Sequence, residues 1–259
     1  MADRDEGAAI EFVDVTYRTA EGRVLLSKLN LRVLRGETLV LLGRSGSGKT
    51  TTLKLINGLL TCQEGSVIVD GKPVSSWDLI RLRRHIGYAI QDVGLFPHIT
   101  VERNVGLVPT LEKWPLQRIR TRVEELLQLV GLPAGEFRRR YPNQLSGGQR
   151  QRVGLGRALA ADPPILLMDE PFGALDPLTR AVIQREFKSL QQRLNKTVVF
   201  VTHDVREAML LATRIAVLDE GRMLGVYSPR DFLQSKDAVV SDYVNVLRSE
   251  MELFQGLES

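Results

Sequence analysis

Short apolar segments alternate along the chain with longer amphipathic ones. The apolar segments are residues 38–43, 165–169, 197–203 and 214–221. None of them alternates polar and apolar residues, which is typical of strands that helices cover on both faces, so they predict a parallel sheet. In the segment 177–194, apolar residues instead recur at the spacing of an amphipathic helix; they are Ile183, Phe187, Leu190 and Leu194. Strands that alternate with helices predict an α/β core.

The two ends of the chain differ from this core. Residues 9–18 and 65–74 have the pattern of antiparallel strands, with turn residues between them. After Ser228 the chain shows one more helical pattern and a polar end. We therefore expect an antiparallel β subdomain beside the parallel sheet and a helical tail at the C-terminus.

The middle of the chain, roughly 92–150, has no strong strand pattern. It contains an amphipathic segment that predicts a helix beginning at Pro115 and ending near Gly131. We interpret this part as a helical insertion in the α/β core. The expected boundaries are roughly 8–91 and 160–227 for the core with its β subdomain, 92–159 for the helical subdomain and 228–259 for the tail.

Composition and charge narrow the class of protein. The chain has 259 residues, of which 43% are hydrophobic and 25% charged, as in ordinary globular proteins. The net charge of +4 comes from basic residues interleaved with acidic ones, which does not favour nucleic acid as a partner. No apolar run approaches the ~18 residues of a membrane span, and the acidic, polar start predicts no secretory signal. The single Cys62 fits a reducing cytoplasm.

The segment GRSGSGKT, residues 43–50, matches the phosphate-binding pattern G-x-x-x-x-G-K-[ST]. It follows the apolar strand 38–42 and precedes a predicted helix over 50–58, which is the context that the pattern requires. Its glycines let successive N–H groups point at phosphate oxygens, and the start of the helix adds positive charge. Lys49 would neutralise the β- and γ-phosphates, and Thr50 would hold Mg²⁺.

Polar residues also follow the other predicted strands. Asp169 ends a buried strand at the edge where open α/β sheets bind ligands, and we expect it to reach Mg²⁺ through water. Glu170 is placed to polarise a water that attacks the γ-phosphate, although a surface charge is the alternative. His203 and Gln91 end two further strand-like segments, so His203 is a candidate γ-phosphate contact and Gln91 a candidate contact to the metal or the water.

A second glycine-rich segment, LSGGQ at 145–149, lies inside the helical insertion. It cannot share one phosphate with residues 43–50 of the same chain in a simple fold. One interpretation is an ordinary helix that Ser146 caps. The other is a site in trans: in a two-fold pair, Ser146 and Gly148 of one subunit would contact the γ-phosphate that Lys49 of the other subunit holds.

Taken together, these motifs resemble the nucleotide-binding subunits of ABC transporters over nearly the whole chain. GRSGSGKT resembles the Walker A motif, ILLMDE the Walker B motif, and LSGGQ the signature motif of the family. Gln91 matches the Q-loop, Asp176 belongs to the D-loop, and His203 matches the switch histidine. Tyr17 lies where the family stacks an aromatic ring on adenine. The resemblance implies the P-loop NTPase fold of an ABC cassette.

The resemblance also implies the roles of particular residues. The expected ATP-binding residues are Tyr17, Gly43, Arg44, Ser45, Gly46, Ser47, Gly48, Lys49, Thr50 and Thr51. The expected catalytic residues are Glu170, His203, Lys49 and Gln91, and the expected ligands of Mg²⁺ are Thr50, Gln91 and Asp169. The signature residues expected to act in trans are Ser146, Gly147, Gly148 and Gln149.

The partners implied by the resemblance are a second ATPase subunit, most simply an identical copy, and integral membrane permease subunits. A solute-binding protein would take part indirectly, and the chain would sit peripherally on the cytoplasmic face of the inner membrane. Phe96, Pro97 and Ile99 are candidates for the contact with the membrane partner, and packing within the helical insertion is the alternative.

The stretch from Arg83 to Val105, with VPTLEKWP shortly after it, is similar to the ATPases of osmoprotectant importers. This similarity implies uptake of glycine betaine, choline, carnitine or proline. Many such ATPases carry C-terminal CBS modules, and the chain is expected to lack them because it ends about 30 residues after Ser228. The alternatives are an ABC ATPase for another small solute, an exporter subunit or, least in keeping with the motifs, a non-transport ABC ATPase or a cassette without chemistry.

Overall fold

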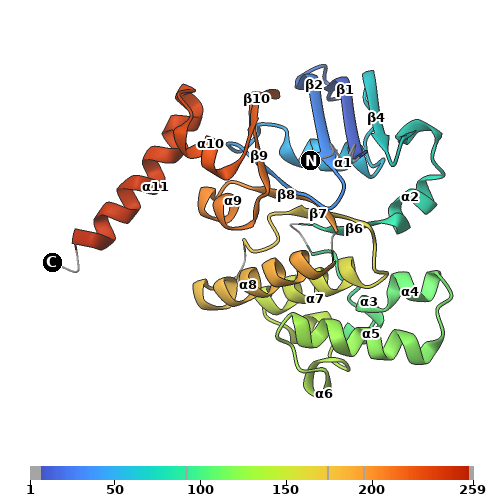
Figure 1. The fold of residues 1–259 in the computed structure, drawn as a ribbon. Coiled ribbons are helices and arrows are strands. Elements are labelled where there is room, and N and C mark those ends of the chain that lie inside the picture. Colours follow the sequence, from blue (N-terminus) through green and yellow to red (C-terminus); the bar gives the residue numbers. More distant parts are fainter. Residues whose placement is uncertain (1–6, 91–92, 174, 195, 257–259) are drawn as a thin grey trace, which may run out of the picture.

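The computed structural model describes residues 7–90, 93–173, 175–194 and 196–256. Two sheets form its frame (Figure 1). The smaller sheet is antiparallel and has the strand order β2-β1-β4-β5. Its strands are β1 (Ala8–Arg18), β2 (Val24–Leu34), β4 (Glu64–Val69) and β5 (Lys72–Pro73). This sheet is the antiparallel β subdomain that the N-terminal pattern predicts.

The larger sheet has the order β10-β9-β3-β8-β7-β6. Its strands are β3 (Thr38–Leu42), β6 (Ile86–Ala89), β7 (Ile165–Asp169), β8 (Thr197–Thr202), β9 (Arg214–Asp219) and β10 (Arg222–Tyr227). Strands β9, β3, β8, β7 and β6 are parallel, and β10 adds an antiparallel edge strand. The four apolar segments of the sequence are β3, β7, β8 and β9, so the predicted parallel core is confirmed.

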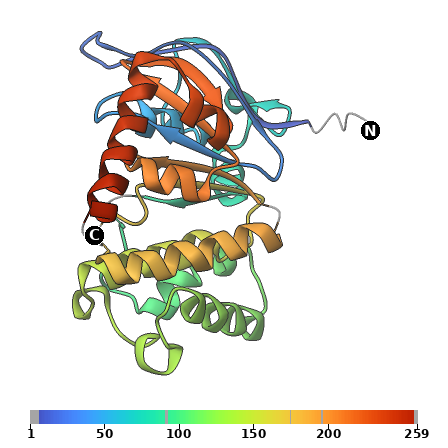
Figure 2. The ribbon, with the colours of Figure 1, turned by 60° about the vertical axis from the view of Figure 1, so that its left-hand side comes forward.

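Most of the helices cover one face of the larger sheet. The helices are α1 (Lys49–Ile56), α2 (Leu79–His85), α3 (Val101–Val105), α4 (Leu107–Leu111), α5 (Leu116–Leu129), α6 (Ala134–Phe137), α7 (Gly147–Leu159), α8 (Pro177–Leu194), α9 (Val205–Leu211), α10 (Pro229–Gln234) and α11 (Ala238–Gly256), with short 3-10 turns at Val74–Ser76 and Pro142–Gln144. Helices α3 to α7 form a layer below the sheet, and α8 crosses beneath it (Figures 1 and 2). Helix α1 lies on the side of the four-stranded sheet.

Two apolar cores lie on opposite faces of the larger sheet. In β3, Leu39 and Leu41 face the core shared with α1 and the four-stranded sheet, whereas Val40 and Leu42 face the core shared with the helical layer. Strands β7 and β8 alternate in the same manner. In the helical-side core, the ring of Phe172 lies 5.5 Å from that of Phe200. Burial on both faces explains why these strands contain no polar positions between their ends.

Two features of the fold depart from the sequence predictions. The prediction of a single helix after Ser228 is wrong, because the chain forms two helices there, α10 and α11. Ser228 caps α10, and Asp237 accepts hydrogen bonds from the N–H groups of Val239 and Val240, so a second helix begins. Strands β2 and β10 were also not predicted from the sequence. Among the residues that the structure describes, no helix has the length and apolar character to cross a membrane.

Candidate functional site

The loop from Gly43 to Gly48 joins β3 to α1 and has the backbone shape of a phosphate cradle. Gly46 and Gly48 have φ angles of 79° and 103°, which residues with a Cβ rarely adopt. Gly48 also has no room for a side chain, because a Cβ there would lie 2.6 Å from Cδ2 of Leu26 in β2. The glycines of the pattern are therefore required both by the curl of the loop and by the strand packed against it.

The Lys49 side chain is folded back into this loop. Its Nζ donates hydrogen bonds to the carbonyl oxygens of Gly43 at 2.7 Å and Arg44 at 2.8 Å. Burial lowers the pKa of Lys49, and the nearby carboxylates of Glu170 and Asp169 oppose this shift. The ammonium group is thus held at the place where a phosphate in the cradle would meet it.

Thr50 and Asp169 meet at the carboxyl edge of the sheet. The Thr50 Oγ1 donates a hydrogen bond of 3.0 Å to Oδ1 of Asp169, which is buried at the end of β7. Burial raises the pKa of Asp169, Glu170 raises it further, and the Thr50 hydroxyl lowers it. A hydroxyl and a carboxylate at this distance are oxygen donors of the type that Mg²⁺ prefers. These two residues therefore fit a magnesium ion whose remaining ligands would be phosphate oxygens and water.

Glu170 and His203 form a second pair beside the first. His203 Nδ1 lies 3.1 Å from Oε1 of Glu170, and the histidine side chain is 67% exposed. The Glu170 backbone is left-handed, with φ 46°, and its N–H donates to the carbonyl of Val201 in β8. The pair therefore stands at the open edge of the sheet, with the carboxylate between the buried Asp169 and solvent.

The signature segment forms the start of α7. Ser146 Oγ accepts from the N–H of Gln149 at 3.2 Å, and Gln149 Oε1 accepts from the N–H of Ser146 at 2.9 Å. This reciprocal pair is a capping box. The interpretation of Ser146 as a helix cap is thus confirmed by geometry. Ser146 and Gly147 are nonetheless exposed, so the helix start also faces solvent.

The D-loop residue Asp176 lies just before α8. Its carboxylate accepts a hydrogen bond of 3.0 Å from the N–H of Thr179, and the hydrogen bonds from Thr179 hold the pKa of Asp176 below its usual range. Gln91, for which a contact to the metal or the water is predicted, lies outside the residues that the structure describes. Its role remains a prediction.

Tyr17, the candidate adenine contact, lies near the end of β1. It pairs with Leu26 across the β1–β2 ladder, so the two side chains share one face of the sheet. Leu26 in turn packs against Gly48. A hollow of about 420 Å³ opens beside the loop, lined by residues 23–25, 44–47 and 219–221. The antiparallel sheet therefore packs against the loop through Leu26, and the contact of Tyr17 with adenine stays a prediction.

Buried polar contacts behind the site were missed by the sequence analysis. Glu207 in α9 accepts hydrogen bonds from Thr202 Oγ1 at 2.6 Å and Gln184 Nε2 at 2.9 Å. Thr202 directly precedes His203, and Gln184 lies on α8. The contacts join the strand end of His203 to the helix that follows Asp176. No local sequence signal marks them, because they depend on the packing of two helices against one strand.

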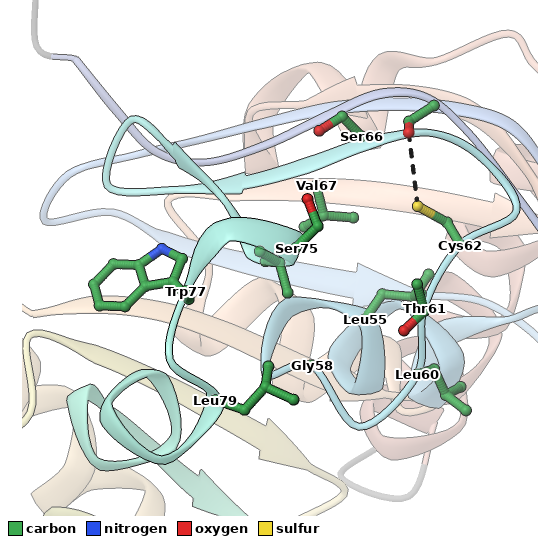
Figure 3. A pocket seen from close by; sticks show the side chains of 12 residues that line it. Leu55, Gly58, Leu60, Thr61, Cys62, Ser66, Val67, Ser75, Trp77 and Leu79 are labelled. Atoms are coloured by element: carbon green, nitrogen blue, oxygen red, sulfur yellow. Dashed lines mark hydrogen bonds between the residues drawn. The ribbon is translucent and has the colours of Figure 1, made fainter.

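Other hollows lie away from this site. One, of about 450 Å³, is at the far end of α1, where the Cys62 thiol donates to the carbonyl of Gly65 (Figure 3). Another, of about 550 Å³, lies between the sheet and the helical layer, and Arg83, Phe96 and Arg157 are among its lining residues. Arg157 donates to the carbonyls of Val93 and Gly94, and burial lowers its pKa.

Comparison with known protein families shows the family to which the chain belongs. The family model of the ABC transporter matches residues 26–173, more than half of the chain. This chain belongs to the ABC transporter family. The match begins in β2 and ends after Glu170. It therefore includes the cradle, the signature segment and the two adjacent carboxylates, Asp169 and Glu170.

Curated ABC transporter proteins resemble the chain over most of its length. The choline transport ATP-binding protein OpuBA of Bacillus subtilis is 49% identical over 91% of this chain and 61% of its own length. The osmoprotectant import ATP-binding protein OsmV of Salmonella typhimurium is 50% identical over 80% of this chain and 54% of its own length. The chain thus spans little more than half the length of these relatives.

Solved ABC structures share the fold. A dimeric structure of the ATP-binding cassette MJ0796, in a post-hydrolysis state bound to ADP and Pi, superposes with a TM-score of 0.79. It is 37% identical, and the match covers 85% of this chain and 99% of that one. The predicted fold class, an ABC cassette with a mainly parallel core, an antiparallel β subdomain and a helical insertion, is confirmed.

The buried Glu207 carboxyl makes stability depend on pH. Burial raises the pKa of Glu207, so the folded state binds its proton more tightly than the unfolded state does. The resulting stabilisation is complete below the ordinary glutamate pKa of about 4.3 and is lost as pH rises through the higher folded-state value. In Glu207→Gln this loss is absent. We expect the free energy of unfolding of Glu207→Gln, relative to the wild type, to increase as pH rises from 4 to 8 in urea titrations.

The matched control is Glu124→Gln, because the Glu124 side chain is 54% exposed on α5. Its unfolding free energy should follow the wild-type profile. If Glu207→Gln also followed that profile, the buried-carboxyl explanation would be wrong.

Proposed function

We propose that the chain is the ATP-hydrolysing subunit of an ABC importer that takes up a small compatible solute. The observation that carries this proposal is the meeting of the Walker A and Walker B motifs in the Thr50–Asp169 hydrogen bond. Lys49 and the Glu170–His203 pair lie at the same edge of the sheet. A phosphate cradle, a metal-binding oxygen pair and a carboxylate beside them are the parts that phosphoryl transfer to water needs.

ATP would lie along the loop from the antiparallel sheet to the sheet edge. The ring of Tyr17 would stack on adenine, and the backbone N–H groups of residues 43–48 would bind the β- and γ-phosphates. Lys49 would exchange its bonds to the Gly43 and Arg44 carbonyls for the phosphate oxygens. Arg44, Ser45, Ser47 and Thr51 complete the set of ATP-binding residues that we propose.

Mg²⁺, held by Thr50, Asp169 and Gln91, would supply charge neutralisation on the phosphates. The chain's own residues would do the rest. Glu170 would accept a proton from the attacking water, since its carboxylate stands between Asp169 and solvent. His203, which lies 3.1 Å from Glu170, would orient that carboxylate and contact the γ-phosphate.

A second copy of the chain would complete each site. The exposed start of α7 offers Ser146, Gly147, Gly148 and the N-terminal dipole of a helix to an anion. In a head-to-tail pair, this segment and Gln149 would face the γ-phosphate bound to the partner, and Asp176 would lie near the same interface. The dimeric state of the similar MJ0796 cassette supports this arrangement.

Membrane permease subunits are the proposed partners on another face. The hollow of about 550 Å³ between the sheet and the helical layer is lined by Phe96, Leu107 and Val108, and Phe96 is 44% exposed. An apolar hollow with an arginine rim fits a helical loop of a permease. The chain would then be peripheral at the cytoplasmic face of the inner membrane, and a solute-binding protein would contact the permease rather than this chain.

The proposed solutes are glycine betaine, choline, carnitine or proline. The relatives that support this are OpuBA, whose name gives choline transport, and OsmV, whose name gives osmoprotectant import. Because the permease and the binding protein contact the solute, the alternative of another small solute is tested by uptake rather than by the geometry of this chain.

Glu170→Gln tests the hydrolytic mechanism. Loss of the general base should lower the ATPase rate by about 10²–10⁴-fold, because the amide cannot accept the proton. ATP binding should survive, so the variant should accumulate as an ATP-bound dimer. Light scattering after size exclusion should show a 29.0 kDa species without ATP and twice that mass with ATP and Mg²⁺. A monomer under both conditions would count against the head-to-tail dimer that binds ATP between its subunits. Glu124→Gln is the control and should keep the wild-type ATPase rate.

Uptake in cells tests the solute class. Deletion of the gene should abolish uptake of labelled glycine betaine or choline after an osmotic upshift. The wild-type gene should restore uptake, whereas Glu170→Gln should not, because transport would draw its energy from hydrolysis at this site. Unchanged uptake after deletion would refute the osmoprotectant assignment and direct the assay to other small solutes.

A further inference from the structure

Gln151 joins the signature helix to the carboxylate strand within one chain. It lies in the second turn of α7, and its side chain is only 5% exposed. Its Nε2 donates a hydrogen bond of 3.2 Å to the main-chain carbonyl of Glu170. Helix α7, which begins with the signature segment, therefore holds the backbone of Glu170, the residue that we propose as general base.

The Glu170 backbone is a place where such a contact matters. Its φ of 46° is left-handed, a conformation that residues with a Cβ rarely adopt. Its N–H donates to the Val201 carbonyl at 3.0 Å, and its carbonyl accepts from the N–H of Gly173 at 3.1 Å as well as from Gln151. These contacts fix the backbone from which the Glu170 side chain extends, so a displacement of this backbone would move the carboxylate with it.

The other polar side chains of α7 hold the helix elsewhere. Arg150 donates to the Leu145 carbonyl at the start of the helix, and Arg152 donates to the carbonyls of Val130 and Gly131 after α5. Arg157 bonds the segment after β6. The arginine contacts of α7 named here thus lie away from Glu170, whereas the Gln151 side chain bonds the Glu170 backbone.

We propose that Gln151 is a positioning residue that couples the two ATP sites of a dimer. The proposal rests on the proposed function, in which the start of α7 contacts the γ-phosphate bound to the partner. Movement of α7 onto that nucleotide shifts the Gln151 amide, and the amide reorients the Glu170 carbonyl in the chain's own site. ATP bound at one site then sets the position of the general base, Glu170, at the other site.

The test replaces the amide while keeping its shape. Gln151→Met has a similar length but no donor, and Gln151→Leu is apolar and also has no donor. The control is Gln128→Met, at an exposed position of α5. Each variant and the wild type are assayed for steady-state ATPase rate against ATP concentration with Mg²⁺. ATP affinity is measured separately at protein concentrations at which the chain is monomeric.

We expect both Gln151 variants to lower kcat by about 10²-fold, the scale of a misplaced catalytic group. We also expect their Hill coefficient to fall to 1, with unchanged ATP affinity of the monomer and an unchanged thermal unfolding midpoint. Unchanged kcat and cooperativity would overturn the proposal. A weakened ATP affinity of the monomer would overturn it as well, because it would show a structural role only.

The wild type separates this proposal from the proposed function. ATP hydrolysis by the wild type with a Hill coefficient of 1 would overturn the coupling and leave the proposed function in place. A wild-type chain without ATP hydrolysis, but with the fold intact, would overturn the proposed function and the coupling with it.

Discussion

The parallel register of β3, β7 and β8 is the constraint on which the site depends. Leu42 pairs with Thr202, and Asp169 pairs with Val201, so the three strands end at one edge of the sheet. The residues that follow them, from Lys49 to His203, are far apart in sequence and meet only because of this pairing. A slip of one residue would turn each side chain to the opposite face, so the two apolar cores that hold the register also hold the site together.

Burial gives this edge its chemical character. It lowers the pKa of Lys49, at the start of α1, and raises that of Asp169, at the end of β7, since both groups lose water there. The opposite charges of Lys49 and Asp169 offset the cost of burial only in part, and Glu170 adds a second negative charge. Such a group of charges is completed by a divalent cation together with an anion. These charges agree with the proposal that a nucleotide binds here together with its metal.

The elements that follow simple periodicity were predictable from the sequence, and so were the residues at their ends. The buried strands and the helix α5 follow from runs and helical spacing, and the cradle, Asp169, Glu170 and His203 follow from their positions after strands. Strand β2 was missed because a bulge at Lys28, with φ 47°, shifts the alternation between Leu26 and Leu29. Gln151 and Glu207 were not predictable, because their partners are chosen by tertiary packing.

In the proposed dimer, the signature segment of one subunit completes the phosphate cradle of another. The most direct measurement is a disulfide cross-link between Ser45→Cys and Ser146→Cys, in a chain whose one native cysteine is removed by Cys62→Ser. Oxidation with ATP and Mg²⁺ should produce a covalent dimer on non-reducing gels, and either single variant should stay monomeric. A cross-link within one chain, or no cross-link with bound ATP, would contradict this arrangement of the two subunits.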